Sequence, residues 1–159
     1  MSIRDSYDIK VVSKIYYEFK DSYAPCVLSP RLASQLIREV TRVSESIINL
    51  AILPGTDTLQ EMIESINDGF YLIDGGNFES SDDDEYACQI THGYHIENGK
   101  IGLPIKNCMV WGFASDFLQT ISKVGNDINW FFDEDIKSNS LISAGGAPSI
   151  KVLMNIGYV

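Results

Sequence analysis

Hydrophobic residues recur along the chain with two different periods, and each period predicts one kind of element. Between residues 7 and 19 nearly every second residue is apolar or aromatic, which is the period of a β-strand or of a bent hairpin. Ser29 and Pro30 then suit the cap and the first turn of a helix. The apolar residues that follow at helical spacing are Leu32, Leu36, Ile37, Val40, Val43 and Ile47, and they predict a helix of about four to five turns.

Two further helices are predicted farther along the chain. The sequence Thr58-Leu-Gln-Glu61 is a capping box, so a second helix is expected to begin there and to end by Gly69. The apolar residues 70–73 after it predict a short strand. A third helix is predicted over residues 115–124, because a serine cap begins this segment and a glycine follows it.

Strict alternation marks a central strand between residues 86 and 94. Its common face is expected to consist of Tyr86, Cys88, Ile90, His92 and Tyr94. Asn98 and Gly99 follow between apolar residues, which is typical of a type I′ hairpin because both turn positions must accept positive φ. With a last apolar strand near residues 150–154, the pattern predicts an α+β fold: one domain over residues 1–159, with a mixed, mainly antiparallel sheet and about three helices.

Composition and charge limit the classes of function. Apolar residues make up 45% and charged residues 21% of the 159 positions, which is typical of one globular domain. The net charge is −10, and an acidic domain repels phosphate backbones, so nucleic acid is not expected as a direct partner. No apolar run approaches the ~18 residues that span a membrane, and the first twenty residues are rich in charge. We therefore expect neither a membrane span nor a signal peptide.

The cysteines and histidines form no pattern typical of catalysis. Three cysteines without C-x-x-C spacing argue against disulfides and a zinc ribbon, and favour a reducing cytoplasm. Cys88 and Cys108 are predicted to be small core residues, whereas Cys26 is expected to be more exposed. His92 and His95 should face opposite sides of a strand, so they are not expected to share a metal. We expect His92 to be half-buried and His95 to lie on the surface; no motif supports a Cys–His pair that uses His92.

Four blocks of the sequence share residues, in order, with a known family. The blocks are Asn49–Ile63, Gly69–Leu72, Gly93–Gly99 and Val124–Asp127. On these blocks the chain resembles the C-terminal part of the TldD/PmbA family of peptidases and peptidase-like proteins, which are also described as modulators of DNA gyrase. The resemblance implies that residues 26–159 form a shortened version of the family's C-terminal domain, with residues 1–25 as an extra N-terminal strand region.

The helix predicted after Pro30 departs from the family at the metal ligands. The family has a zinc-binding His-Glu-x-x-x-His sequence here, and on this alignment Arg38 and Val43 stand at the two histidine positions while Glu39 keeps the general-base glutamate. No cysteine follows Cys108 to serve as the third ligand. Because a guanidinium cannot ligate a cation and zinc hydrolysis typically needs three protein ligands, the resemblance implies no metal and no cofactor.

The resemblance therefore implies a catalytically degenerate relative. The family includes metal-free members that pair with a metal-bearing partner and help to hold the peptide, so we expect a non-catalytic scaffold or peptide-binding subunit that pairs with such a paralogue or with itself. A peptide could add to the strand 86–94 at a sheet edge. The candidate peptide-binding residues are Cys88, His92, Tyr94 and His95. The alternatives are a metal-free accessory factor or small-molecule enzyme of a biosynthetic pathway, and a peptidase active only with a metal-bearing partner.

Overall fold

The computed structural model describes residues 15–41, 49–134 and 142–159, and the elements below lie within these ranges. The strands of the larger sheet are β1 (Ser22–Leu28), β3 (Asp68–Ser80), β4 (Glu85–Glu97), β5 (Lys100–Pro104), β6 (Cys108–Phe113), β7 (Lys123–Val124) and β10 (Ile150–Tyr158). The smaller sheet contains β2 (Asn49–Ala51), β8 (Asn129–Glu134) and β9 (Ile142–Ala147). The helices are α2 (Pro30–Thr41), α3 (Leu59–Glu64) and α4 (Ala114–Gln119). This mixture confirms the predicted α+β class.

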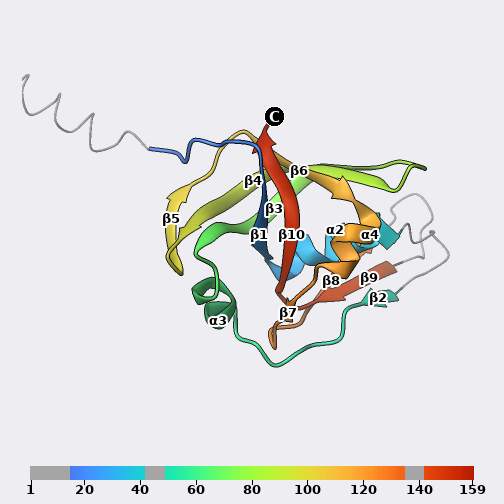
Figure 1. Ribbon diagram of the computed structural model, residues 1–159. Helices are drawn as coiled ribbons and strands as arrows, with labels where there is room; N and C mark the ends of the chain where they lie inside the picture. The colour runs from blue at the N-terminus through green and yellow to red at the C-terminus, as the bar shows by residue number, and fades with distance from the viewer. Residues whose placement is uncertain (1–14, 42–48, 135–141) are drawn as a thin grey trace, which may run out of the picture.

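The larger sheet closes into a barrel. Five strands follow one another around it in the order β1, β3, β4, β6 and β10, and β10 pairs again with β1 (Figure 1). The β1–β3 pair is parallel, since α2 lies in the connection between these strands, and the other four pairs are antiparallel. Closure leaves these five strands without a long open edge, which protects the backbone hydrogen bonds. The observed sheet is thus mixed and mainly antiparallel, as predicted. Its closure into a barrel has no signal in the sequence.

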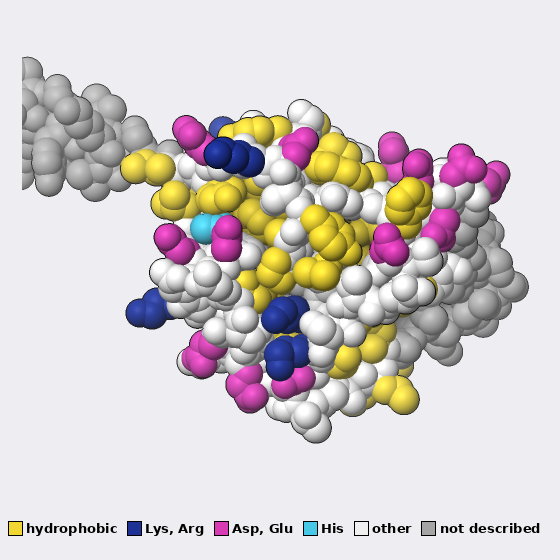
Figure 2. All heavy atoms as spheres, in the orientation of Figure 1, with side chains coloured by type: hydrophobic (Ala, Val, Ile, Leu, Met, Phe, Trp, Pro, Cys, Tyr) yellow, Lys and Arg dark blue, Asp and Glu magenta, His cyan; other side chains and the backbone are white. Residues whose placement is uncertain are grey.

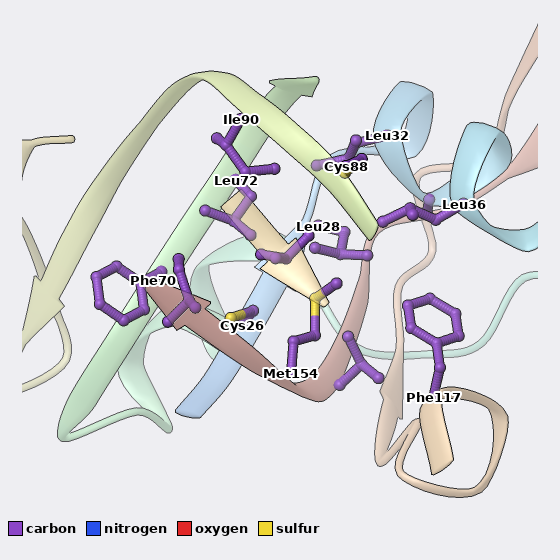
Figure 3. Close-up of a cluster of buried hydrophobic side chains, with 14 of the residues drawn as sticks. Cys26, Leu28, Leu32, Leu36, Phe70, Leu72, Cys88, Ile90, Phe117 and Met154 are labelled. Atoms are coloured by element: carbon purple, nitrogen blue, oxygen red, sulfur yellow. The ribbon is translucent and has the colours of Figure 1, made fainter. Parts of the chain in front are cut away.

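The inside of the barrel is filled with apolar side chains. Inward-facing residues of β1, β3, β4 and β10 meet the apolar face of α2, as Figure 3 shows. Leu32 and Leu36 of α2 are fully buried in this cluster. The cluster also includes Cys26, Leu28, Phe70, Leu72, Cys88, Ile90, Phe117 and Met154. Burial of one such side chain stabilises the fold by about 1.5–3 kcal/mol, so the core fixes how α2 lies against the barrel.

A second, smaller apolar cluster lies on the outside of the barrel. Met62 and Ile66, in and just after α3, pack against Val27 and Ile96. Thr58 caps α3 as predicted, because its hydroxyl accepts a hydrogen bond of 3.1 Å from the Glu61 backbone N–H. The helix ends at Glu64, earlier than the expected stop at Gly69.

The smaller sheet lies beside α2. Its strand β9 pairs with β2 in parallel and with β8 antiparallel. The helix approaches β9 at Gly145, where an added Cβ would clash with the Ser34 hydroxyl and would lie 3.7 Å from the Arg38 guanidinium. A side chain at this position would force the Ser34 hydroxyl to move, and α2 lies between the barrel core and the smaller sheet.

Several predicted boundaries change in the structure. The strand expected over residues 70–73 extends over all of β3, and the last strand continues to Tyr158. The third helix is shorter than predicted, and Ser115 lies inside it rather than at its cap; its hydroxyl donates to the Asp84 carboxylate at 2.6 Å. Within the described ranges, no helix has the length and apolar character needed to cross a membrane.

Two predictions fall partly or wholly on residues that the structure does not describe. Residues 15–19 of the predicted N-terminal strand have no regular secondary structure, and the earlier part of that strand lies outside the described residues. The predicted first helix is seen as far as Thr41. Its continuation, including Val43, lies outside them as well.

Candidate functional site

Arg38 and Glu39, at the positions of the expected metal helix, point to different neighbours. The Arg38 guanidinium lies near Gly145 of the smaller sheet, and Arg31, two turns earlier, lies with its guanidinium 5.1 Å from the ring centre of Phe131 in β8. These contacts place basic side chains between α2 and the smaller sheet. A cationic guanidinium at the first ligand position opposes binding of a second cation.

Glu39, the next residue, lies beside the turn between β3 and β4. It lines a hollow of about 90 Å³ together with Asp82, Asp84 and Glu85 from the β3–β4 turn and the start of β4. No group of three or more His, Cys, Asp or Glu side chains among the described residues is arranged to hold a metal ion. Within the described ranges, Arg38 and Glu39 thus form no metal-binding group with their neighbours.

Two of the four candidate peptide-binding residues line an open groove. The groove has a volume of about 730 Å³ and lies where β4 leaves β6 and has not yet met β5. His92 is about half exposed, and its ring contacts the Tyr94 hydroxyl at 3.5 Å and the Asp74 carboxylate at 3.8 Å. Three other lining residues, Tyr16, Lys106 and Asn107, were not predicted, because no motif in the sequence marks them.

A bulge in β4 explains why His92 faces the solvent. The pairing of β3 with β4 shifts register around Asp74, so His92 pairs with Asp74 while Ile90 pairs with Gly75. Tyr86, Cys88 and Ile90 remain buried, but His92 leaves their face. The expectation of one common face from residue 86 to 94 is therefore wrong beyond Ile90, although His92 is half-buried beside a tyrosine as expected.

His95 is buried, contrary to the expectation of a surface position. Its ring stacks on Tyr17 with the centroids 4.1 Å apart, and its Nε2 lies 2.6 Å from the Asp68 carboxylate. These contacts hold the chain before β1 against the barrel. His95 therefore has a structural environment, away from the groove.

Cys88 and the other two thiols lie in the barrel core. All three are buried, so Cys88 and Cys108 are core residues as predicted, whereas the expected exposure of Cys26 is wrong. Burial raises the pKa of Cys88 to about 12, with smaller contributions from Cys108 and Glu39. Burial also raises the pKa of Cys108 to about 12 and raises the pKa of Cys26. Protonated, enclosed thiols are poor nucleophiles, and of the four candidates His92 and Tyr94 alone are accessible to a peptide in the groove.

The sequence of this chain is similar to a known protein family and to several known relatives. Residues 37–157 match the family described as the PmbA/TldA metallopeptidase C-terminal domain. The chain is 30% identical over 114 residues to a zinc metalloprotease TldD homologue of Saccharolobus solfataricus, with 70% of this chain and 26% of the relative covered. It is 32% identical over 111 residues to a metalloprotease TldD homologue of Buchnera aphidicola, with 65% of this chain and 22% of the relative covered. The chain thus spans about a quarter of the length of these relatives.

Solved structures share the fold. A candidate modulator of DNA gyrase from Thermotoga maritima superposes with a TM-score of 0.69 at 13% identity, over 89% of this chain and 51% of that one. TldE from Thermococcus kodakarensis superposes with a TM-score of 0.63 at 13% identity, over 90% of this chain and 52% of that one. At this identity the likeness concerns the fold alone.

Proposed function

The chain belongs to the PmbA/TldD family, and we propose that it is a member without the zinc site that serves as a non-catalytic, peptide-binding or scaffold subunit of a peptidase-type complex. The observation that carries this proposal is Arg38, which the resemblance aligns with the first metal ligand, in a helix that packs on the barrel core. On the alignment that the resemblance implies, Arg38 and Val43 stand at the two histidine positions, and no cysteine follows Cys108 to serve as the third ligand. Glu39 then has no metal-bound water to deprotonate.

The groove at His92 and Tyr94 supports a peptide as the ligand. A peptide can contact the β4 backbone along the groove while its side chains meet the His92 ring, the Tyr94 hydroxyl and the Lys106 ammonium group. The lining is part polar and part apolar and is open to solvent. A small-molecule enzyme or accessory factor, the first alternative, would be favoured by a closed apolar cavity instead.

Binding of an unstructured peptide tests this assignment. We expect His92→Ala and Tyr94→Ala each to weaken binding several-fold in a fluorescence anisotropy titration. Gln60→Ala, which changes an exposed side chain on α3, is the matched control and should leave the affinity unchanged. Equal affinity for all four proteins would exclude the groove as the peptide site.

The proposed partner is a metal-bearing member of the same family. We expect the purified chain alone to contain no stoichiometric zinc and to leave an unstructured peptide intact. Co-expression with a metal-bearing member should give a heteromer in size-exclusion chromatography with light scattering. If this chain alone cleaves the peptide, and a chelator stops the cleavage, the non-catalytic assignment is wrong.

Kinetic measurements on the same complex distinguish the proposed non-catalytic subunit from the second alternative, a peptidase that is active only with its metal-bearing partner. A scaffold or peptide-holding subunit should lower the KM of the metal-bearing partner, with any catalytic water held by the partner's metal. If hydrolysis by the complex depends on Glu39 of this chain, the alternative of a peptidase that is active only with its partner is correct instead.

A further inference from the structure

A pocket of about 310 Å³ lies on the outer face of the barrel, at the end of β4 and β6 opposite to the groove. Its walls come from β1, β4, β6, β10 and α4. The lining includes four aromatic side chains in addition to Phe117, two carboxylates and one amide. These residues are Tyr23, Tyr86, Trp111, Phe113, Glu85, Asp116 and Asn155.

The strand register brings the aromatic side chains together. Tyr23 of β1 pairs with Asn155 of β10, which in turn pairs with Trp111 of β6, so these three outward side chains form one row across the barrel. Figure 2 shows hydrophobic side chains gathered over the middle of this face, with acidic side chains beside them. Tyr23 is 53% and Phe113 is 50% exposed, so both rings are accessible to a ligand from solvent.

Gly112 opens the pocket toward the barrel interior. A Cβ at this position would lie 3.2 Å from the hydroxyl and 3.2 Å from Cε1 of Tyr86. The buried Tyr86 ring occupies that space and packs edge-on against Phe117 at 5.5 Å. The absence of a side chain at Gly112 therefore lets a rigid aromatic ring form one wall of the pocket.

The charge of the pocket is negative, and the aromatic rings have no cation from the described parts of the chain. Asp116 and Glu85 both line the cavity. The cation–π contacts between described residues are those of Arg31 with Phe131 and of Lys106 with Tyr16, both outside this pocket. Ion pairs within the described ranges do not involve Asp116 or Glu85 either. Aromatic faces next to carboxylates attract an organic cation through the ring quadrupole and the Coulomb energy.

We propose that this pocket binds the guanidinium group of an arginine side chain carried by a peptide. A planar guanidinium can stack on Trp111 or Tyr23 while its N–H groups donate to the Asp116 carboxylate, which an ammonium group cannot do equally well. The site adds to the proposed peptide-binding function but does not rest on the groove, since the two share no lining residue.

Two short peptides test the site. The blocked peptide acetyl-Ala-Arg-Ala-amide and its citrulline analogue have nearly the same shape, and only the first carries a charge. Trp111 fluorescence in a Trp130→Phe background reports binding, because Trp111 and Trp130 are the two tryptophans of the sequence. We expect the arginine peptide to bind about 10-fold more tightly than the citrulline peptide, from one cation–π contact and one carboxylate pair. Equal binding of the two peptides, or binding of neither, would overturn the proposal.

Two matched variants locate the binding. Asp116→Asn should weaken the arginine peptide about fivefold, whereas Asp83→Asn, in the nearby turn but outside the pocket lining, should change its affinity less than twofold. If the two variants weaken binding equally, the attraction comes from the overall acidic charge and not from this pocket. His92→Ala should leave arginine binding unchanged even if it abolishes binding in the groove, so the two sites fail independently. A lysine peptide that binds more tightly than the arginine peptide would contradict the choice of guanidinium.

Discussion

The two sides of helix α2 differ in how deeply their side chains are buried. On one side Leu32, Leu36 and Val40 are buried in the barrel core. On the other side Arg38 and Glu39 are partly exposed and lie at the aligned positions of the family's metal helix. The core side has the apolar spacing of a packed helix, while the outer side carries Arg38 and Glu39, on which the proposed function depends.

This difference shows that packing and chemistry place separate demands on one helix. A polar residue at Leu36 would leave an unpaired group in a closed core, so the fold itself requires an apolar side chain there. Arg38 is only partly buried and lies near the smaller sheet, outside the barrel core. The predictions below test how far the two sides of the helix are independent.

The largest effect is expected from the core side. Leu36→Ala should lower the free energy of unfolding by about 2–5 kcal/mol, because it leaves a cavity among fully buried side chains. Leu36→Met, which nearly conserves volume, should cost less than about 1.5 kcal/mol. Urea unfolding followed by circular dichroism measures both. Similar small losses for the two variants would mean that α2 contributes little to the core.

The next largest effect on stability is expected at Asp127, in the block Val124–Asp127 that resembles the family. The Asp127 carboxylate accepts hydrogen bonds from the Ser149 N–H at 2.8 Å and from the Ser149 hydroxyl at 2.6 Å. Ser149 is fully buried, so Asp127→Ala leaves donors unpaired and should cost about 1–3 kcal/mol. Asp127→Asn keeps one oxygen acceptor and should cost less in the same urea titration. An unchanged Asp127→Ala protein would show that this block is not needed for the fold.

Sequence patterns predicted the parts of the fold that depend on local chemistry. The helix after Pro30 and the Thr58 cap appear as expected. The Asn98–Gly99 turn has φ values of 51° and 74°, which suit the predicted type I′ hairpin. Each of these features depends on a few neighbouring residues.

The features of the fold that the sequence did not predict depend on hydrogen bonding between strands that are distant in the sequence. Closure of the barrel by β1 and β10 joins segments at opposite ends of the chain, and no local period signals it. The β4 bulge at His92 depends on the register of β3. This one shift exposes His92 and changes which candidate residues can reach a ligand.

The buried thiols provide a smaller test of the core side. Their ordinary pKa is 9.0, and burial raises the pKa of Cys88 and of Cys108 to about 12. The unfolded chain therefore loses thiol protons between pH 9 and 12 while the folded chain keeps them, so stability is full below pH 9 and falls as the pH rises. Each thiol should contribute a slope of up to about 1.4 kcal/mol per pH unit. Cys88→Ala should reduce this slope in urea titrations at pH 8 to 10.5, by an amount that approaches about 1.4 kcal/mol per pH unit at the upper end. An unchanged slope would contradict the burial of this thiol.

The smallest effect is expected on the outer side of α2. Glu39→Gln should change the free energy of unfolding by less than about 0.5 kcal/mol, as is usual for partly exposed positions outside the core. Glu97→Gln, at the exposed end of β4, is the matched control. In a complex with a metal-bearing family member, Glu39→Gln should also leave peptide hydrolysis unchanged, because the proposed function places the metal-bound water in the partner and not beside this carboxylate. A large loss of hydrolysis with unchanged stability would show that Glu39 is still a general base, and the outer side of α2 would then have kept its chemistry along with its packing.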